Sequence, residues 1–295
     1  MRILICGGKG QLGRDCHAIL GRYHEVKSVD VDELDIADPS QVEKGVAGFG
    51  PDVIVNCAAY TAVDACETTP ELAWKVNAEG PGNLATAGER HGARLVHIST
   101  DYVFDGRRVP PEPYLETDEP HPVSIYGKSK LGGETAVRKA TNDYMILRTA
   151  WLYGIGGVNF LKTMLRLALK NPTRELKVVN DQFGSPTWSY RLALQIERLI
   201  QAGGQGVYHA TSEGYGTWYE LALEFLDRMA VAHCTVPCAT AEYPTPATRP
   251  INSILENRRL KESGINLMQG WQTDLGQFVV TFKDRLIAEA AEDGI

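Results

Sequence analysis

Short apolar runs alternate with segments of helical periodicity along the first half of the chain. The run at residues 3–5 is followed by Leu12, Cys16, Ile19 and Leu20, whose spacing predicts a helix with one apolar face. Further apolar runs at 26–31, 53–55, 95–98 and 145–147 are separated by helical patterns at 39–46, 73–87 and 126–140. Alternating strands and helices form right-handed crossovers, so we expect an α/β fold: a Rossmann-type doubly wound parallel sheet with helices on both faces.

The alternation weakens after about residue 150. A helix at 159–170, a strand at 176–179 and a helix at 190–201 still fit it. Short strands near 207–210, a helix at 218–231 and a proline-rich stretch at 243–250 break it. We therefore expect a Rossmann domain at 1–150 and a smaller C-terminal substrate-binding lobe formed mainly by 151–295, with segments near 172–204 returning to the first domain.

Composition narrows the class of protein. Apolar residues make up 43% of the 295 residues and charged residues 23%, as in ordinary globular proteins. The net charge of -7 argues against a nucleic-acid partner, because phosphate binding needs clustered lysine and arginine. No apolar run approaches the ~20 residues that cross a bilayer, and the N-terminus does not resemble a signal peptide. We expect a cytoplasmic protein without a membrane partner, with six cysteines that pack as small apolar side chains and bind no metal.

A glycine trio lies between the first expected strand and the first expected helix. Gly7, Gly10 and Gly13 permit a tight turn and let the backbone approach a pyrophosphate, which then meets the helix N-terminus. Asp30 ends the second strand, where a carboxylate accepts hydrogen bonds from adenosine ribose hydroxyls and favours NADH. Lys9 instead favours the 2′-phosphate of NADPH, so the sequence predicts a dinucleotide site for NADPH or NADH without choosing between them.

Tyr126 and Lys130 form the candidate catalytic pair. They are four residues apart, so on a helix they share one face. A nearby ammonium stabilises a phenolate and lowers the phenol pKa, which lets the pair exchange a proton with an alkoxide as hydride moves. Ser99 and Thr100 end the preceding strand, and because adjacent strand residues point to opposite faces, only one of them should lie beside Tyr126.

These residues resemble the extended short-chain dehydrogenase/reductase superfamily and, within it, the dTDP-4-dehydrorhamnose reductase family. The resemblance runs through nearly the whole chain in the family's order. It rests on residues 10–13 (GQLG), 59–64 (AYTAVD), 99–106 (STDYVFDG), 159–160 (NF), 181–187 (DQFGSPT), 243–246 (YPTP) and 249–253 (RPINS).

The resemblance implies an oxidoreductase that reduces the 4-keto group of dTDP-4-dehydro-β-L-rhamnose to dTDP-L-rhamnose. Tyr126 would donate the proton, Lys130 would tune Tyr126 and hold the nicotinamide ribose, and Thr100 would orient the carbonyl. Cofactor contacts would map, besides the three glycines and the catalytic pair, to Gln11, Leu12, Asp30, Asp35, Ile36, Ala59, Tyr60 and Thr61. Sugar contacts would map to Val63, Thr100, Asp101 and Trp151.

Three of these assignments have a structural alternative. An aromatic side chain at Trp151 suits lobe packing as well as a sugar platform, and Val63 suits the core. Arg249 suits either the substrate diphosphate or a carboxylate that pins the proline-rich loop. The resemblance also implies Mg²⁺ and a homodimer held partly by acidic residues, although the sequence contains no assignable cluster of acidic ligands.

Two other functions share the same motifs. A nucleotide-sugar dehydratase carries a glutamate directly after Thr-Asp, where this chain has Tyr102, which argues against dehydration. A 4-ketoreductase or epimerase for another nucleotide sugar fits the same cofactor loop and Tyr/Lys pair. A non-catalytic cofactor-binding regulatory subunit has no need of Thr100, Tyr126 and Lys130 together, so their presence favours an enzyme.

Overall fold

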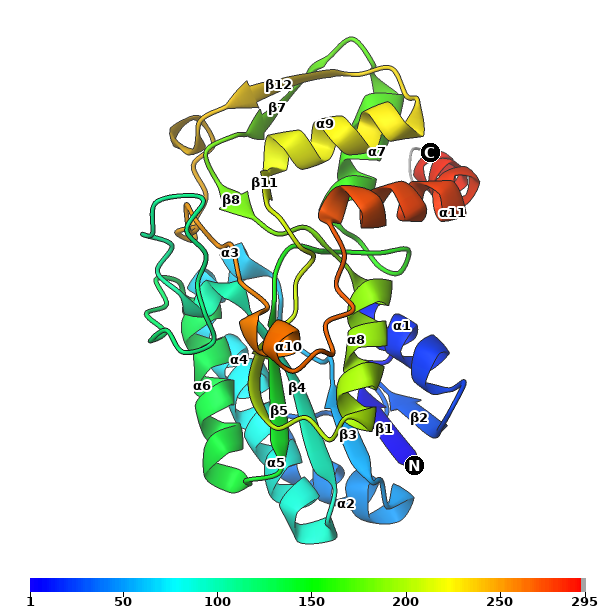
Figure 1. The fold of residues 1–295 in the computed structure, drawn as a ribbon, viewed down its shortest axis with the longest axis vertical. Helices are drawn as coiled ribbons and strands as arrows, with labels where there is room; N and C mark the ends of the chain where they lie inside the picture. The colour runs from blue at the N-terminus through cyan, green and yellow to red at the C-terminus, as the bar shows by residue number, and fades with distance from the viewer. Residues whose placement is uncertain (293–295) are drawn as a thin grey trace.

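A six-stranded, fully parallel sheet forms the centre of the molecule (Figure 1). Residues 1–292 are described by a computed structural model. The strands lie in the order β10-β5-β4-β3-β1-β2. Their bounds are β1 (Arg2–Cys6), β2 (Glu25–Val29), β3 (Val53–Asn56), β4 (Arg94–Thr100), β5 (Tyr144–Thr149) and β10 (Gly206–His209). The Rossmann-type fold is confirmed, and the strand order reverses at β1 and β3, where such sheets bind ligands at the carboxyl ends of their strands.

Helices cover both faces of this sheet because successive strand residues point to opposite sides. Ile3 and Ile5 pack in one apolar core with α1 (Gln11–Leu20) and α8 (Ser189–Gln201). Leu4, between them, packs in the core on the other face. That face is covered by α2 (Pro39–Phe49), α5 (Gly80–His91) and α6 (Ile125–Ala140), so the sheet is buried on both sides, as apolar parallel strands require.

The helix expected at 73–87 is interrupted. The chain forms α3 (Val63–Thr68), α4 (Pro70–Trp74) and the π-helical turn η1 (Lys75–Glu79) before α5 begins. A π turn holds one extra residue and is frequent at functional sites. Its middle residue, Asn77, is fully buried and directed at the loop after β3.

The second lobe lies above the carboxyl ends of the sheet strands in Figure 1 and has its own apolar core. Phe225 and Phe278, both fully buried, come from its helices α9 and α11. No helix within residues 1–292, α11 included, is both long and apolar enough to cross a membrane. The lobe contains α7 (Phe160–Lys170), β7 (Glu175–Val179), α9 (Trp218–Met229), β12 (Cys234–Cys238) and α11 (Trp271–Glu292), with the short strands β6 (Leu152–Tyr153), β8 (Phe183–Gly184), β9 (Thr187–Trp188) and β11 (Gly216–Thr217).

Residues 172–210 are shared between the main sheet and the lobe in a different way from the one we expected. Within 172–204, α8 returns to the sheet and packs on α1, whereas β7 pairs with β12 in the lobe. Glu175 and Lys177 of β7 are exposed, and a half-polar strand does not suit a sheet buried on both faces. The short strand that we expected in the lobe near 207–210 is β10, which joins the edge of the main sheet beside β5.

Candidate active site

The β1–α1 loop is a crowded turn that only glycine can form. Gly7 has a φ of 79°, and a Cβ there would lie 2.6 Å from the Ala58 backbone nitrogen, because the loop presses on the end of β3. A Cβ on Gly13 would overlap the Gly7 carbonyl oxygen. Gly10 precedes α1 and offers no capping side chain, so the first-turn amides of Gln11 and Leu12 face an open N-terminus. This cradle of backbone N–H groups fits a pyrophosphate.

Asp30 organises the rim of the same loop. Its carboxylate accepts hydrogen bonds from the backbone nitrogens of Lys9 (2.8 Å) and Val31 (2.9 Å). The Lys9 ammonium, which the sequence suggested for a 2′-phosphate, pairs with exposed Asp32 at 2.7 Å. Asp30 and Lys9, the two residues that bear on the choice between NADH and NADPH, therefore both have hydrogen-bond partners within the protein.

The next expected cofactor residues differ in exposure. The Asp35 carboxylate accepts the Ala37 backbone N–H at 2.9 Å and turns the chain toward α2. Ile36 is only 4% exposed and packs against α5, where a Cβ on Gly80 would lie 2.7 Å from its Cδ1 atom. The Ile36 side chain thus belongs to the core, and its backbone carbonyl accepts a hydrogen bond from Asn83.

The loop after β3 is held by Asn77, which the sequence analysis missed. The Asn77 side chain accepts from the Tyr60 backbone nitrogen at 2.8 Å and donates to the Tyr60 carbonyl at 3.0 Å. It also donates to Ser129 of α6 at 3.1 Å. Asn77 therefore fixes residues 59–61, which include Ala59 and Thr61, against the helix that carries the catalytic pair. A polar residue inside an otherwise amphipathic helical pattern was the available signal.

Thr100, rather than Ser99, lies beside Tyr126. The Ser99 hydroxyl points to the other face of the sheet and donates to Glu134 at 2.7 Å. The Thr100 hydroxyl donates to Asp101 at 2.8 Å, and Thr100 also lies within hydrogen-bonding reach of the Tyr126 phenol. The alternation along β4 thus brings the expected hydroxyl to the expected tyrosine.

Tyr126 and Lys130 occupy the first turns of α6. Gly127 lets this helix approach closely, since a Cβ there would overlap the Tyr102 carbonyl oxygen. The rings of Tyr126 and Tyr102 meet edge to face, 5.5 Å apart. Lys130 donates to the Ile98 carbonyl oxygen at 2.7 Å. The pair therefore lies at the carboxyl end of β4, the strand next to β3 in the sheet.

The pKa values of Tyr126 and Lys130 are both shifted by burial, and the shift of Tyr126 is opposite to the expected one. Burial raises the pKa of Tyr126 above its usual value and outweighs the opposing effect of Thr100, with the negative charge of Asp101 adding to the rise. Burial lowers the pKa of Lys130 to about 8, while the charge of Glu134 opposes this shift. The expected lowering of the Tyr126 pKa is thus wrong for this structure, because desolvation dominates. The raised pKa keeps Tyr126 in the protonated form that a proton donor needs.

Asp101 completes the polar end of the site. It is 3% exposed, and burial raises its pKa to about 6, against the hydrogen bonds from Thr100 and Ser253. Its Oδ2 atom has no hydrogen-bond partner among residues 1–292. A buried carboxylate oxygen without a donor can accept a hydroxyl of a bound sugar.

The remaining expected substrate residues lie between the two lobes. Val63 begins α3 and packs near Tyr126. Trp151 follows β5 and stacks on Trp218 of the lobe, so its ring takes part in lobe packing. Arg249 donates to Asp64 of α3 at 2.7 Å, which corresponds to the carboxylate alternative and ties the proline-rich loop to the Rossmann domain.

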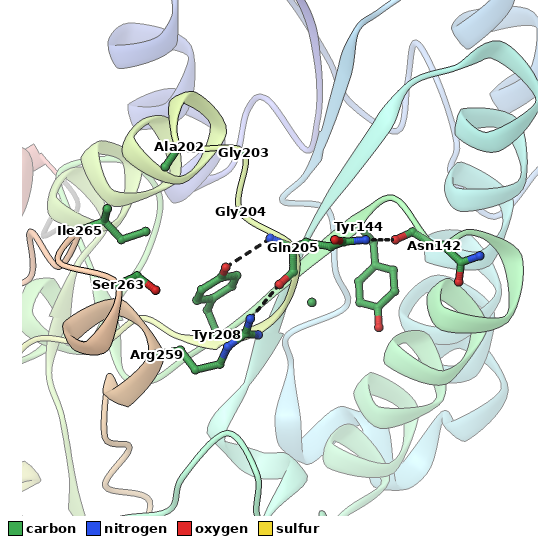
Figure 2. A pocket seen from close by; sticks show the side chains of 11 residues that line it. Asn142, Tyr144, Ala202, Gly203, Gly204, Gln205, Tyr208, Arg259, Ser263 and Ile265 are labelled. Carbon is green, nitrogen blue, oxygen red and sulfur yellow. Dashed lines mark hydrogen bonds between the residues drawn. The ribbon is translucent and has the colours of Figure 1, made fainter.

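A search for metal ligands and the shape of the surface add little to this arrangement. Within residues 1–292, no three His, Cys, Asp or Glu side chains converge to hold a metal ion. A cavity of about 610 Å³ is lined by Tyr144, Gly206 and Arg259 (Figure 2). Tyr144 and Gly206 begin β5 and β10, so the cavity lies at the opposite end of the sheet from the carboxyl end of β4. Arg259 there already donates to the carbonyls of Val207 and Gln205.

The dinucleotide-type loop, the switch point between β1 and β3, and the Thr100, Tyr126 and Lys130 cluster define a short-chain dehydrogenase/reductase-type protein. Comparison with known proteins narrows this class. The family model described as RmlD substrate binding domain matches residues 1–283. A dTDP-4-dehydrorhamnose reductase from Burkholderia thailandensis is 42% identical over 295 residues, covering 94% of this chain and 97% of the relative.

Solved structures agree with this assignment. A dTDP-4-dehydrorhamnose reductase from Clostridium acetobutylicum has a TM-score of 0.92 at 43% identity, covering 96% of this chain and 100% of the other. The Bacillus anthracis protein of the same description, in complex with NADP, has a TM-score of 0.92 at 40% identity, covering 95% and 99%. The chain belongs to the RmlD substrate binding domain family, as its motifs predicted.

Proposed function

We propose that this protein is an NADPH- or NADH-dependent reductase that converts dTDP-4-dehydro-β-L-rhamnose to dTDP-L-rhamnose, with Tyr126 as proton donor. The observation that carries the proposal is the placement of Thr100, Tyr126 and Lys130 together at the carboxyl end of β4, beside the glycine loop. Reductases of this description that resemble the chain over nearly its whole length support the choice of substrate.

The glycine loop and the loop after β3 would hold the cofactor. When bound, the reduced nicotinamide supplies the hydride for sugar C4. The amides at the start of α1 fit the pyrophosphate, and Asp30 lies where the adenosine ribose binds in such folds. The proposed cofactor contacts are Gly7, Gly10, Gln11, Leu12, Gly13, Asp30, Asp35, Ile36, Ala59, Tyr60, Thr61, Tyr126 and Lys130.

Three side chains would act on the sugar carbonyl. Tyr126 gives its phenolic proton to the C4 oxygen as negative charge develops there, and its raised pKa keeps that proton available until then. Thr100 would turn its single O–H from Asp101 Oδ1 to the same oxygen and so orient the carbonyl. Lys130, cationic below pH about 8, stabilises the phenolate that remains and holds the nicotinamide ribose.

The rest of the substrate would lie between the Rossmann domain and the lobe. Val63 and Trp151 would flank the sugar, and the free oxygen of Asp101 would accept one of its hydroxyls. Arg249 would contact the diphosphate by exchanging its bond with Asp64 for phosphate oxygens.

The test is sugar-dependent oxidation of NADPH, and separately NADH, with dTDP-L-rhamnose identified as the product. Tyr126→Phe should keep NADPH affinity and lose turnover by about 100-fold or more, because general acid catalysis contributes on that scale. Tyr153→Phe is the matched control, since it removes a buried phenol hydroxyl that lacks a partner among the described residues. Equal turnover in Tyr126→Phe and wild type would remove Tyr126 from the acid role. Oxidation with a different 4-keto sugar alone would reassign the substrate.

The homodimer stays a prediction of the family resemblance, and the cytoplasmic location stays a prediction from the sequence composition. Light scattering coupled to gel filtration measures the mass of the assembly directly. A mass of twice 32.4 kDa would support the dimer.

A further inference from the structure

Glu134 is a fully buried carboxylate beneath the proposed active site. It lies on α6, one helical turn beyond Lys130 and two beyond Tyr126, so the three residues follow one face of the helix.

Its oxygens join three elements of the Rossmann domain. Ser99 of β4 donates to Oε1 at 2.7 Å. Arg148 of β5 donates through Nε at 2.9 Å and Nη2 at 2.8 Å, and Arg138 of α6 donates at 3.0 Å. Ser99 directly precedes Thr100, so the carboxylate connects the strand that carries Thr100 to the helix that carries Tyr126 and Lys130.

A buried ion pair of this kind is poorly explained by stability alone. Removing two charges from water costs several kcal/mol per ion in general, and apolar residues of similar volume often stabilise a fold as well or better. Arg148 is also incompletely satisfied, because its Nη1 atom has no hydrogen-bond partner among residues 1–292. The arrangement instead favours a defined geometry around the carboxylate.

We propose that Glu134 is a positioning residue for the reduction: it fixes Thr100 against the Tyr126–Lys130 pair and supplies the buried negative charge that balances the Lys130 ammonium. The inference rests on the proposed function for its kinetic consequence, but its electrostatic consequence is independent of turnover.

The electrostatic consequence follows from the groups around Lys130. Burial favours its neutral form, and the charge of Glu134 opposes this, with a smaller contribution of the same sign from Cys57 after β3. His97 of β4 also lies near Lys130 and is held neutral by burial and by the Lys130 charge. Arg138 and Arg148 carry two positive charges against the one negative charge of Glu134; Arg148 is buried beside the carboxylate, whereas the Arg138 side chain is 41% exposed. His209, beside Arg148 on β10, is held neutral by burial and by the Arg148 charge. Removal of the Glu134 charge should therefore lower the pKa of Lys130 further below about 8.

The central variant is Glu134→Gln, which keeps the shape and loses the charge. We expect kcat to fall by about 10- to 100-fold, the scale for misplaced catalytic groups, with NADPH affinity and the sugar KM within about threefold of wild type. The high-pH decline of kcat should move to lower pH. Ser99→Ala is the charge-preserving counterpart: it should lower kcat about two- to tenfold without moving that decline. A normal kcat and pH profile in Glu134→Gln would overturn the proposal, as would an unchanged kcat in Ser99→Ala.

A second measurement separates this inference from the proposed function. The titration of Lys130 can be followed by NMR in protein with labelled lysine, assigned with Lys130→Arg, and it needs no substrate. Glu134→Gln should titrate Lys130 at lower pH than wild type, and Glu134→Asp should restore most of the difference. The same Lys130 pKa in wild type and Glu134→Gln would refute the charge-balancing role even if the enzyme reduces the sugar. A lowered pKa in a protein that reduces no keto sugar would support the role and refute the proposed function. If Glu134→Gln does not fold, the positioning role is tested by kcat in Glu134→Asp and Ser99→Ala: both should fall below wild type while Lys130 titrates as in wild type, and a wild-type kcat in both would overturn the proposal.

Discussion

Trp151 stacks face to face on Trp218, with ring centroids 3.7 Å apart and the planes within 9° of parallel. Trp151 follows β5 with a φ of 48°, an uncommon conformation for a large side chain, and Trp218 is the first residue of α9. A Cβ on Gly184 would overlap the Trp151 ring, so the glycine makes room for the stack. The stack therefore couples the end of the catalytic sheet to the lobe.

Trp218→Ala should weaken both the lobe and sugar binding. Loss of a large packed aromatic side chain removes about 3 kcal/mol from the free energy of unfolding, measured by urea denaturation. Steady-state kinetics should show a larger rise in KM for the sugar than for NADPH, because the stack lies on the lobe side. Trp74→Ala, at a ring that is 42% exposed, serves as the control and should change both quantities little. Equal rises in both KM values would argue against a lobe-specific role.

Gly13→Ala should abolish tight cofactor binding. The added methyl group would overlap the Gly7 carbonyl oxygen and push the loop away from the α1 N-terminus. We expect the Kd for NADPH, measured by fluorescence titration, to rise by about 100-fold or more, since a helix N-terminal phosphate site depends on close backbone approach. Gly48→Ala in α2 has no atom within 4 Å of the new Cβ and should bind NADPH normally. Wild-type affinity in Gly13→Ala would contradict the proposed pyrophosphate site.

Asp32→Asn should shift the cofactor preference toward NADPH. Asp32 pairs with the Lys9 ammonium, and loss of its charge frees Lys9 for a 2′-phosphate. The ratio of kcat/KM for NADPH to that for NADH should rise several-fold at low salt, and less at high salt because exposed charges are screened. Glu25→Gln, at the other end of β2, removes a comparable exposed charge and should leave the ratio unchanged. If this ratio is the same in Asp32→Asn and wild type at both salt concentrations, Lys9 does not contribute to the choice between NADPH and NADH.

Asp101→Asn should change stability in a pH-dependent way. The folded protein holds a proton on Asp101 up to pH about 6, whereas the unfolded chain releases it near 3.8, so the buried carboxylate destabilises the fold progressively as pH rises through that range. The wild type therefore carries a penalty on the order of 3 kcal/mol at pH 7 that is absent near pH 3 to 4. The neutral amide should gain stability relative to wild type between pH 4 and pH 7, measured by urea denaturation. A constant difference across that range would contradict the raised pKa.

The sequence predicted the parts of the molecule whose chemistry is local. Gly13 is explained by its contact with Gly7 in the same loop, and Tyr126 and Lys130 by the spacing of one helix. Contacts between distant segments escaped it. The pairing of β7 with β12 depends on which partner a half-polar strand meets. The Tyr126 pKa depends on how deeply the phenol is buried, and periodicity does not measure burial depth.

The sequence also failed to predict the roles of two buried polar residues. Asn77 and Glu134 lie inside helical patterns, where polar residues usually face water, yet both are fully buried. Only the tertiary structure shows that Asn77 holds the Tyr60 loop and that Glu134 receives Ser99 and Arg148.

The most direct test of the account is to follow a deuterium atom from the nicotinamide C4 position of NADPH into the sugar. The wild-type protein with dTDP-4-dehydro-β-L-rhamnose should give dTDP-L-rhamnose that carries the label at sugar C4, and Tyr126→Phe should bind the same cofactor but form this product far more slowly. Label at another carbon, or no labelled sugar despite cofactor binding, would contradict hydride transfer to the 4-keto group.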